Sequence, residues 1–534
     1  MDSNAKILDA VIIGAGFAGL YSLYRMLGAD HTARVFEVGD NVGGTWYWNR
    51  YPGARCDVES MEYSYSFDNE LQQTWEWSER YATQPEILNY ANHVADRFDL
   101  RDHITFNTRV ESAHYDEATK TWLVTTDTGE EIRSRFCIMA TGCLSSVNKP
   151  DFKGIDSFKG NSYHTGQWPH DGVDFSGRSV GIIGTGSSAI QSIPHIAEQA
   201  SQLTVFQRTA NFSVPAHNHE LDESFIDEIK NDYSNFRAEN RDMHGGFGAR
   251  RPMHMDSIWD ASDEQRLSRF EERWALGGLG FLGSFADVSM TLEANNIVAD
   301  FVRSKIQDIV ADPSTAELLS PNGVVGCKRL CVDTNYYATY NRDNVSLIDV
   351  SEHPIDEITE KGLITNGTEY PFDDLIFATG FDAMTGTLLK IDIRGKNGLT
   401  LQEKWQAGPR TYLGLSMHGF PNLFTISGPG SPSVLSNMIV TIEQHVNWII
   451  DCVDYMRDKD LTLIEADLDA EDTWVTQGNE MADMTLMPRC NSWYLGANVP
   501  GKPRVFMPFV GGLPMYIEIC NNVAANQYQG FTVS

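Results

Sequence analysis

Two stretches of the chain show the same order of apolar and polar positions. Each begins with a predicted buried strand, at 6–13 and at 179–183. In the first, Val11, Ile12 and Ile13 are apolar without alternation, which is typical of parallel strands covered on both faces. A glycine-rich turn, a helical stretch and a second apolar run follow each of them, the last at 35–36 and at 203–206. This order predicts an α/β fold with two Rossmann-like, dinucleotide-binding units.

The remaining pattern predicts elements around these two units. Residues 104–110, 121–126 and 132–141 are expected to form strands of a small antiparallel layer. Between 216 and 325 the chain is richer in charge, and the apolar residues from 297 to 310 fall on one helical face. Residues 216–325 are therefore predicted to form a helical insertion.

The first glycine-rich turn has the spacing of a dinucleotide-binding fingerprint, Gly14-Ala-Gly16-Phe-Ala18-Gly19. Gly14 permits the tight turn, Gly16 lets a pyrophosphate approach the backbone, and Gly19 lets the helix pack on the strand. The helix N-terminus supplies N–H groups for the phosphates. Glu37, at the end of the second strand, can accept both ribose hydroxyls and repels a 2′-phosphate. These features together predict an FAD site.

The second turn, Gly184-Thr-Gly186-Ser-Ser-Ala189, repeats this arrangement with a change of charge. Arg208 follows the second turn at the same distance, within one residue, as Glu37 follows the first turn. A guanidinium pairs well with a phosphate, so an arginine at this point selects NADPH over NADH. The second unit is therefore predicted to bind NADPH.

The composition excludes several classes of function. The chain has 534 residues with 41 Lys and Arg against 73 Asp and Glu, and this net charge of −32 argues against a nucleic-acid binder and against an anionic membrane as partner. No apolar run of 18 residues is present, so no membrane span is expected.

The cysteines point to a reducing compartment. The eight cysteines include no Cys-x-x-Cys, and Cys327 and Cys331 have no second ligand pair, so we expect neither a disulfide framework nor a metal site. We therefore expect a cytoplasmic protein, and we expect it to be a monomer.

A twelve-residue stretch between the two units has the pattern Phe158-x-Gly160-x-x-x-His164-x-x-x-Trp168-Pro169. It resembles the signature of the Baeyer–Villiger monooxygenases, flavoenzymes that insert an oxygen atom beside a ketone. The resemblance covers nearly the whole chain, is weakest in the helical insertion, and is closest to the phenylacetone and steroid monooxygenase branch. It implies FAD and NADPH as cofactors, with O₂ and a small-molecule ketone as substrates.

The resemblance also implies how the chain is divided. An FAD-binding domain would comprise residues 1–145 and 376–534, the second of these with the C-terminal region. An NADP-binding domain would comprise residues 146–215 and 326–375, and the helical insertion would occupy 216–325.

The family's catalytic residues match positions outside the two turns. Arg329, which is permanently charged, would stabilise a C4a-peroxyflavin and the negative oxygen of its adduct with the ketone. Asp57 would hold and orient this arginine. Lys328 would assist at the 2′-phosphate of NADPH. The substrate pocket would be bordered by Ser433, Val434 and Leu435.

The cofactor contacts implied by the resemblance form two sets. The residues expected at FAD are Gly14, Gly16, Ala18, Gly19, Glu37, Thr45, Trp46, Tyr47, Trp48, Asp57, Tyr63, Val110 and Met438. Those expected at NADPH are Arg55, Cys56, Asp57, Thr185, Gly186, Ser187, Ser188, Ala189, Ile190, Gln191, Arg208, Thr209, Lys328, Arg329 and Trp493.

Some alternatives stay open at this point. His164 has no evident proton to transfer, so it is either a hinge or anchor of the linker or a structural histidine. A flavin-containing monooxygenase that oxidises amines or thioethers is the nearest rival function, and Trp168 and the Lys328–Arg329 pair disfavour it. A pyridine-nucleotide disulfide reductase would need a redox cysteine pair near the flavin, and a non-enzymatic flavin-binding redox module is the third rival.

Overall fold

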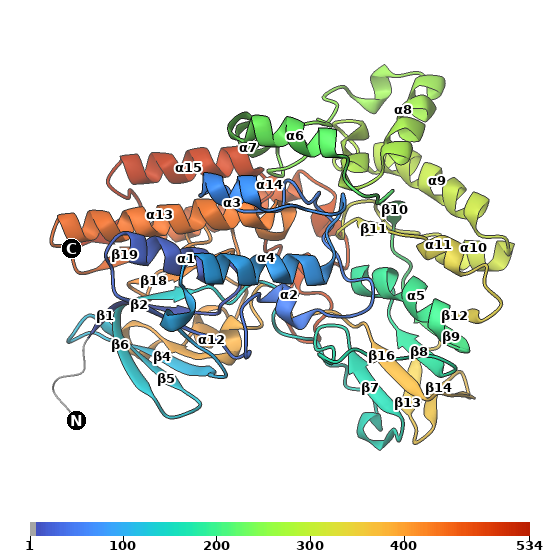
Figure 1. Cartoon of the computed structure of the whole chain (residues 1–534), viewed down its shortest axis with the longest axis horizontal. Coiled ribbons are helices and arrows are strands. Elements are labelled where there is room, and N and C mark those ends of the chain that lie inside the picture. The colour runs from blue at the N-terminus through green and yellow to red at the C-terminus, as the bar shows by residue number, and fades with distance from the viewer. Residues whose placement is uncertain (1–6) are drawn as a thin grey trace.

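Two sheets, both built around parallel strands and flanked by helices, form the two halves of the molecule (Figure 1). The structure is a computed structural model that describes residues 7–534. Its sheets and helices confirm the predicted α/β class with two Rossmann-like units.

The first sheet is centred on the strand that precedes the first glycine-rich turn. Its strands are β1 (Leu8–Ile13), β2 (Ala33–Phe36), β3 (Ile104–Thr105), β4 (Val110–Asp116), β5 (Thr121–Thr126), β6 (Glu131–Met139), β17 (Asp392–Arg394) and β18 (Leu423–Thr425). They lie in the order β17–β4–β5–β6–β1–β2–β3, and β18 also pairs with β6. β1 pairs in parallel with β2 and β6, while β5 pairs antiparallel with β4 and β6.

The antiparallel layer differs from the prediction at one point. Residues 104–110 do not form one strand, because β3 ends at Thr105 and β4 begins only at Val110. Between them Asn107 has φ +52°, and its backbone N–H turns back to the carbonyl of Gly39. The break sends β3 to one edge of the sheet and β4 to the other side of β1.

The second sheet is wholly parallel. Its strands are β7 (Asn161–His164), β8 (Ser179–Ile183), β9 (Gln202–Gln207), β12 (Val345–Asp349) and β16 (Asp374–Phe377), in the order β12–β9–β8–β16–β7. Every pair in this order is parallel. The helix α5 (Ser187–Gln199) follows β8, as the second fingerprint predicts.

The stretch between the two turns is part of this second sheet. Residues 161–164 form β7, an edge strand, so the predicted linker is only in part a connection. β16 extends to Phe377, so residues 376–377 also belong to the second sheet, whereas the resemblance assigned them to the FAD-binding domain. The other domain boundaries stay predictions.

The chain passes between the sheets after β6 and again after β16, and the two crossings are joined to one another. The backbone N–H of Asn148 donates to the carbonyl of Gly380 at 2.9 Å, and the Thr379 hydroxyl donates to the carbonyl of Asn148 at 2.7 Å. Gly142 and Gly380, each the third residue of an Ala-Thr-Gly repeat, have φ +71° and +78°.

The predicted insertion is helical. It contains α6 (Glu223–Asn231), α7 (Tyr233–Arg241), α8 (Asp263–Leu276), α9 (Leu292–Ile309) and α10 (Pro313–Leu319). The helix predicted at 297–310 is the C-terminal part of α9, which begins after Thr291, whose side chain accepts a hydrogen bond from Ala294. Asp312 caps the next helix, α10, because its side chain accepts a hydrogen bond from the Thr315 N–H.

Long helices cover the first sheet. In Figure 1, α13 (Met438–Asp458) runs beside α1 (Phe17–Gly28), and α15 (Leu513–Ala525) lies next to α13. Among residues 7–534, no helix combines the length and the apolar character that crossing a membrane requires.

The other α-helices and strands are α2 (Thr45–Trp48), α3 (Asn69–Thr74), α4 (Gln84–Arg97), α11 (Tyr336–Thr339), α12 (Leu401–Lys404), α14 (Leu468–Asp483), β10 (Ser213–Pro215), β11 (Cys331–Asp333), β13 (Ile355–Ile358), β14 (Gly362–Thr365), β15 (Thr368–Pro371), β19 (Ile464–Ala466) and β20 (Phe531–Val533).

Two cysteines form a disulfide. Cys327 and Cys490 are bonded, with their Cα atoms 6.1 Å apart, and the other six cysteines are free and buried. The pair had no signal in the sequence, because its members are 163 residues apart and belong to no cysteine motif.

Candidate active site

The first glycine-rich turn lies between β1 and α1 and leaves no room for a side chain at Gly14 or Gly19. Gly14 has φ +105°, and a Cβ there would lie 2.6 Å from the carbonyl oxygen of Ala140. A Cβ on Gly19 would lie 1.8 Å from the Gly14 oxygen. Gly16 precedes α1 and supplies no side-chain cap, so the first N–H groups of the helix are available to an anion. The turn fits the pyrophosphate of a dinucleotide.

Glu37 lies against this turn. Its carboxylate accepts hydrogen bonds from the backbone N–H groups of Ala15 and Gly39, both at 2.7 Å. Burial raises the pKa of Glu37, and these two N–H groups partly offset that effect. The carboxylate is thus next to the phosphate turn, where a ribose-binding acid is required.

The segment that contains α2 packs on the same turn. The Gly43 N–H donates to the carbonyl of Ala15 at 3.0 Å. In α2, the indole N–H of Trp46 donates to the hydroxyl of Tyr63 at 3.1 Å, and both rings are buried. The structure therefore brings Trp46 and Tyr63 together near the turn, as their predicted contact with a flavin requires.

The other residues expected at FAD differ in accessibility. Ala18 and Val110 are buried, whereas Thr45 is exposed and Met438, the first residue of α13, is partly exposed. Tyr47 donates its hydroxyl to Asp40 at 2.7 Å and so has a partner within the chain.

The second turn repeats the geometry of the first. Gly184 has φ +113°, and a Cβ there would lie 2.5 Å from the carbonyl oxygen of Ala378. Gly186 precedes α5 without a side-chain cap, and a Cβ on it would meet no atom within 4 Å. This open space before the helix N-terminus fits a second pyrophosphate. Ala189 and Ile190 are fully buried, and their side chains pack α5 on the sheet, while their predicted place at NADPH stays a prediction.

Two cations lie near each other, Arg208 directly after β9 and Lys328 shortly before β11. Arg208 is exposed and Lys328 is partly buried. Burial lowers the pKa of Lys328, and the charge of Arg208 lowers it further. Within residues 7–534 neither side chain forms an ion pair with a carboxylate. Two neighbouring cations without a counter-ion fit a phosphate dianion, such as the 2′-phosphate of NADPH.

Residues 51–57 join the two halves of the molecule. The Tyr51 hydroxyl donates to the side chain of Gln191 in α5 at 2.8 Å, and the amide of Gln191 donates to the carbonyl of Arg55 at 3.1 Å. The Arg55 side chain is paired with Glu79 at 2.9 Å, so its charge is already compensated. Asp57, at the end of this segment, is thereby held beside the NADP-binding unit.

Arg329 and Asp57 form the centre of the candidate site. The Nε and Nη2 atoms of Arg329 donate to the two carboxylate oxygens of Asp57, each at 2.8 Å, and Nη1 donates to the carbonyl of Val434 at 2.6 Å. Burial alone would lower the pKa of Arg329, but the charge of Asp57 and its hydrogen bonds outweigh this and raise the pKa above its ordinary value. The guanidinium is therefore a fixed cation.

The predicted substrate loop lies next to this pair. Ser433 and Val434 are buried, and Ser433 has φ +39°. Val434 packs in an apolar cluster with Cys143, Met384 and Tyr494, three residues that the sequence did not single out. Burial raises the pKa of Tyr494 to about 12, and the charge of Arg329 lowers it in part.

The linker residues are anchored in the second sheet. His164, the last residue of β7, lies 3.2 Å from the Thr379 hydroxyl and accepts a hydrogen bond from the Gly166 N–H. Burial lowers its pKa to about 4, so the ring is neutral. Trp168 is buried against Tyr163, with ring centroids 5.4 Å apart. These contacts fit an anchor, not a proton-transfer group.

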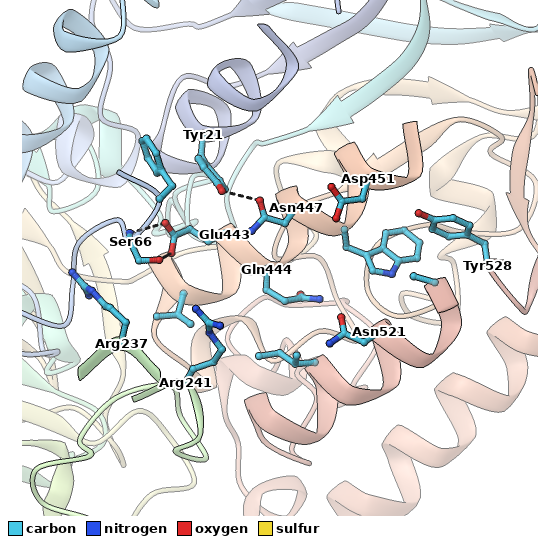
Figure 2. A pocket seen from close by; sticks show the side chains of 15 residues that line it. Tyr21, Ser66, Arg237, Arg241, Glu443, Gln444, Asn447, Asp451, Asn521 and Tyr528 are labelled. Carbon is cyan, nitrogen blue, oxygen red and sulfur yellow. Dashed lines mark hydrogen bonds between the residues drawn. The ribbon is translucent and has the colours of Figure 1, made fainter. Parts of the chain in front are cut away.

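A separate cavity of about 320 Å³ lies between α1, α7, α13 and α15 (Figure 2). Two pairs of its polar groups bond each other: Tyr21 donates to Asn447, and Ser66 donates to Glu443 through both its N–H and its hydroxyl. None of the predicted site residues lines this cavity. The candidate active site is therefore the Arg329–Asp57 region.

Comparisons with known proteins agree with this geometry. Residues 11–246 match the model of the family described as pyridine nucleotide-disulphide oxidoreductase. The chain is 44% identical to a Baeyer-Villiger monooxygenase of Pseudooceanicola batsensis, over 98% of this chain and 95% of that protein. The chain belongs to the Baeyer–Villiger monooxygenases.

Solved structures of such monooxygenases are also close to this one. An oxidised steroid monooxygenase bound to NADP is 51% identical, with a TM-score of 0.94 and 99% of each chain covered. OTEMO in complex with FAD and NADP is 42% identical, with a TM-score of 0.95 over 99% of this chain and all of that one. Membership of the Baeyer–Villiger monooxygenases, inferred from the linker pattern, is thus confirmed, while the roles of single residues stay predictions.

Proposed function

We propose that this chain binds FAD and NADPH and uses O₂ to convert ketones into esters or lactones. The observation that supports this most directly is the bidentate Arg329–Asp57 pair, because it holds a permanent cation beside two dinucleotide turns in a chain of this family. FAD, when bound, supplies the redox chemistry, taking a hydride from NADPH and delivering oxygen to the ketone.

Arg329 stabilises negative charge on oxygen during this transfer. A guanidinium has five N–H bonds, and three are engaged with Asp57 and Val434, so two remain to face a ligand. Because Asp57 fixes the orientation, no reorganisation is needed when charge develops, and preorganised donors of this kind contribute most to catalysis. Asp57 is accordingly a positioning residue.

NADPH is held by the second turn and by the cation pair. The open face at Gly186 receives the pyrophosphate, and Arg208 with Lys328 receives the 2′-phosphate. Trp493, with the segment around it, covers the nicotinamide end. A cofactor that stays bound after reduction of the flavin keeps water away from the reacting oxygen.

The substrate is an apolar ketone. The residues around Val434 that border the site are predominantly hydrophobic and include Leu144, Met384, Leu435 and Phe506. Apart from Arg329, which is assigned to the oxygen anion, such a lining offers no charged partner for an ionic substrate and favours burial of apolar groups.

One experiment separates this proposal from its rivals. The purified flavoprotein is supplied with NADPH and O₂ together with a ketone panel, an amine and a thioether, and the products are identified by mass spectrometry. Ester or lactone formation supports the proposal. Oxygenation of only the amine or thioether supports the rival monooxygenase, and flavin that NADPH does not bleach supports a non-enzymatic module.

We also propose that the enzyme works in the cytoplasm as a monomer. Six of the eight cysteines are free and buried, which is compatible with a reducing compartment, and the Cys327–Cys490 disulfide is the exception. Fractionation of the source cells and light scattering of the purified holoenzyme test the two parts separately.

A further inference from the structure

The Cys327–Cys490 disulfide joins two segments that both reach the candidate site. Cys327 directly precedes Lys328 and Arg329 in the chain. Cys490 lies three residues before Trp493, in a segment of residues 486–509 that we call the C-terminal strap. One covalent bond thus connects the residues assigned to the 2′-phosphate and the oxygen anion with the residue assigned to the nicotinamide end.

The strap is held elsewhere by hydrogen bonds. At one end the Leu486 N–H donates to the carbonyl of Ser289 in the helical insertion, at 2.9 Å. Further along, Asn498 donates to the carbonyl of Phe381 at 2.7 Å and Lys502 pairs with Asp382 at 2.5 Å. These contacts fix the strap to the insertion and to the second crossing between the sheets.

The loop that carries Arg329 has different partners. Val325 exchanges two hydrogen bonds with Asn295 of α9, and Arg329 bonds Asp57 and Val434. Across residues 7–534, no hydrogen bond connects residues 323–330 with the strap. Apart from side-chain packing, the disulfide is therefore what couples the two segments.

We propose that Cys327 and Cys490 are a redox-controlled positioning pair, whose disulfide fastens the strap to the Arg329 loop and so retains NADP⁺ in the site. Cys327 is buried and Cys490 is partly exposed, which gives a small reagent a route to the pair from one side. When the bond is reduced, the strap stays fixed at Leu486 and at Asn498, and only the stretch between them, which carries Trp493, can shift away from Lys328 and Arg329. Lys328 and Arg329 themselves remain in place, and only their covalent connection to the strap is lost.

The redox step is balanced by simple reagents. Two thiols lose two electrons and two protons to form the disulfide, and one hydrogen peroxide accepts them to give two molecules of water. A flavin oxygenase of the proposed function releases hydrogen peroxide when turnover is unproductive, so the oxidant arises beside the pair. A dithiol reverses the step, itself becoming a cyclic disulfide.

The test compares oxidised and reduced holoenzyme. Digestion without reductant followed by mass spectrometry should yield a cross-linked peptide that contains Cys327 and Cys490, and dithiothreitol should abolish it. The Kd of NADP⁺, measured on the holoenzyme by titration, should rise on reduction about five-fold or more, a common size for coupling between two sites. The kcat at saturating NADPH should change less than this Kd.

Variants make the test independent of the reductant. Cys490→Ser, at the partly exposed position, should have the NADP⁺ affinity of reduced parent enzyme and should no longer respond to dithiothreitol or to peroxide. Cys327→Ser should behave in the same way. Flavin content measured on each variant identifies one that has simply failed to fold.

The proposal rests on the proposed function only for the source of the oxidant, and the two can fail separately. If no ketone is oxygenated but the Kd of NADP⁺ still depends on the disulfide, the proposed reaction is wrong and the positioning pair stands. If the cross-linked peptide does not form even with added peroxide, or if oxidised and reduced enzyme bind NADP⁺ equally, the positioning pair is wrong.

Discussion

Arg329 and Asp57 are 272 residues apart in the chain, and yet the guanidinium of one donates two hydrogen bonds of 2.8 Å to the carboxylate of the other. Asp57 comes from a segment of the first unit that packs on α5, while Arg329 comes from the chain that returns after the helical insertion. The pair therefore forms only when both dinucleotide-binding units are folded and correctly docked.

Arg329→Ala should abolish ester formation while the flavin stays bound. The contacts assigned to FAD lie at the first turn and at Glu37, so they are untouched. Removing one preorganised group that stabilises an oxygen anion typically costs about 10²–10³ in rate. The measurement is the ratio of ester to hydrogen peroxide per NADPH consumed. Arg329→Lys is the control variant, because it keeps the charge but loses the two-nitrogen contact with Asp57. Normal coupling in Arg329→Ala would refute the role assigned to Arg329.

Asp57→Ala should lower both coupling and stability. It leaves a largely buried guanidinium without its anionic partner, and an unsatisfied group of this kind costs about 1–3 kcal/mol. Thermal unfolding of the holoenzyme reports the stability and product analysis reports the coupling. Asp57→Asn, which retains one acceptor, should have a stability and a coupling between those of the parent and those of Asp57→Ala. A variant as stable and as well coupled as the parent would show that Val434 alone positions Arg329.

Arg208→Ala should weaken the use of NADPH and spare that of NADH. A charge-assisted hydrogen bond to phosphate contributes about 1.5–3 kcal/mol, so the KM for NADPH should rise about ten-fold or more. Steady-state kinetics with both nucleotides provide the check. An unchanged preference for NADPH over NADH would mean that another group reads the 2′-phosphate.

The affinity for NADPH should fall with rising pH earlier than an ordinary lysine predicts. Burial and the charge of Arg208 lower the pKa of Lys328, so its cation is lost at lower pH than usual, and only the cation attracts the phosphate. Titrations of NADP⁺ binding across alkaline pH measure the effect. Lys328→Arg should remove this dependence, and Arg208→Ala should move its onset to higher pH. An onset that does not move in Arg208→Ala would contradict the coupling of the two cations.

His164 should make the folded protein sensitive to acid. Its pKa in the fold is about 4, below the value of about 6.5 for an exposed histidine, so between these values the unfolded chain binds the extra proton. Stability is therefore fully present above about pH 6.5 and declines as the pH falls toward 4, by on the order of 3 kcal/mol. Urea unfolding at several pH values measures this. His164→Gln should flatten the profile over that window, and an unaltered slope would place the acid sensitivity elsewhere, for instance at the buried His445.

The sequence predicted the two sheets and the two turns because each rests on local rules. A glycine that must accept φ above +100°, as at Gly14 and Gly184, and an acid or base at the end of the following strand are features of a single short segment. The strands β5 and β8 have the first and last residues that were predicted, because each is likewise encoded within a single short segment.

What the sequence did not predict depends on contacts between distant segments. The division of residues 104–110 follows from Asn107 bonding Gly39, and the pairing of Cys327 with Cys490 follows from the path of the strap. Tyr494 was missed because a buried tyrosine in a sequence looks like any core residue, and only the nearby Arg329 gives it a chemical setting.

The paired crossings have a mechanical consequence. The two crossing segments are bonded to each other through Asn148, Thr379 and Gly380. Together they resist rotation of one sheet relative to the other, which a single connecting segment would allow. One sheet cannot spin freely about the other without breaking these bonds. A change in the angle between the sheets can take place only where both crossing segments bend together. Gly142 and Gly380, which both have positive φ, are the residues with the backbone freedom to bend. The double connection therefore restricts the directions in which the two sheets can move relative to each other.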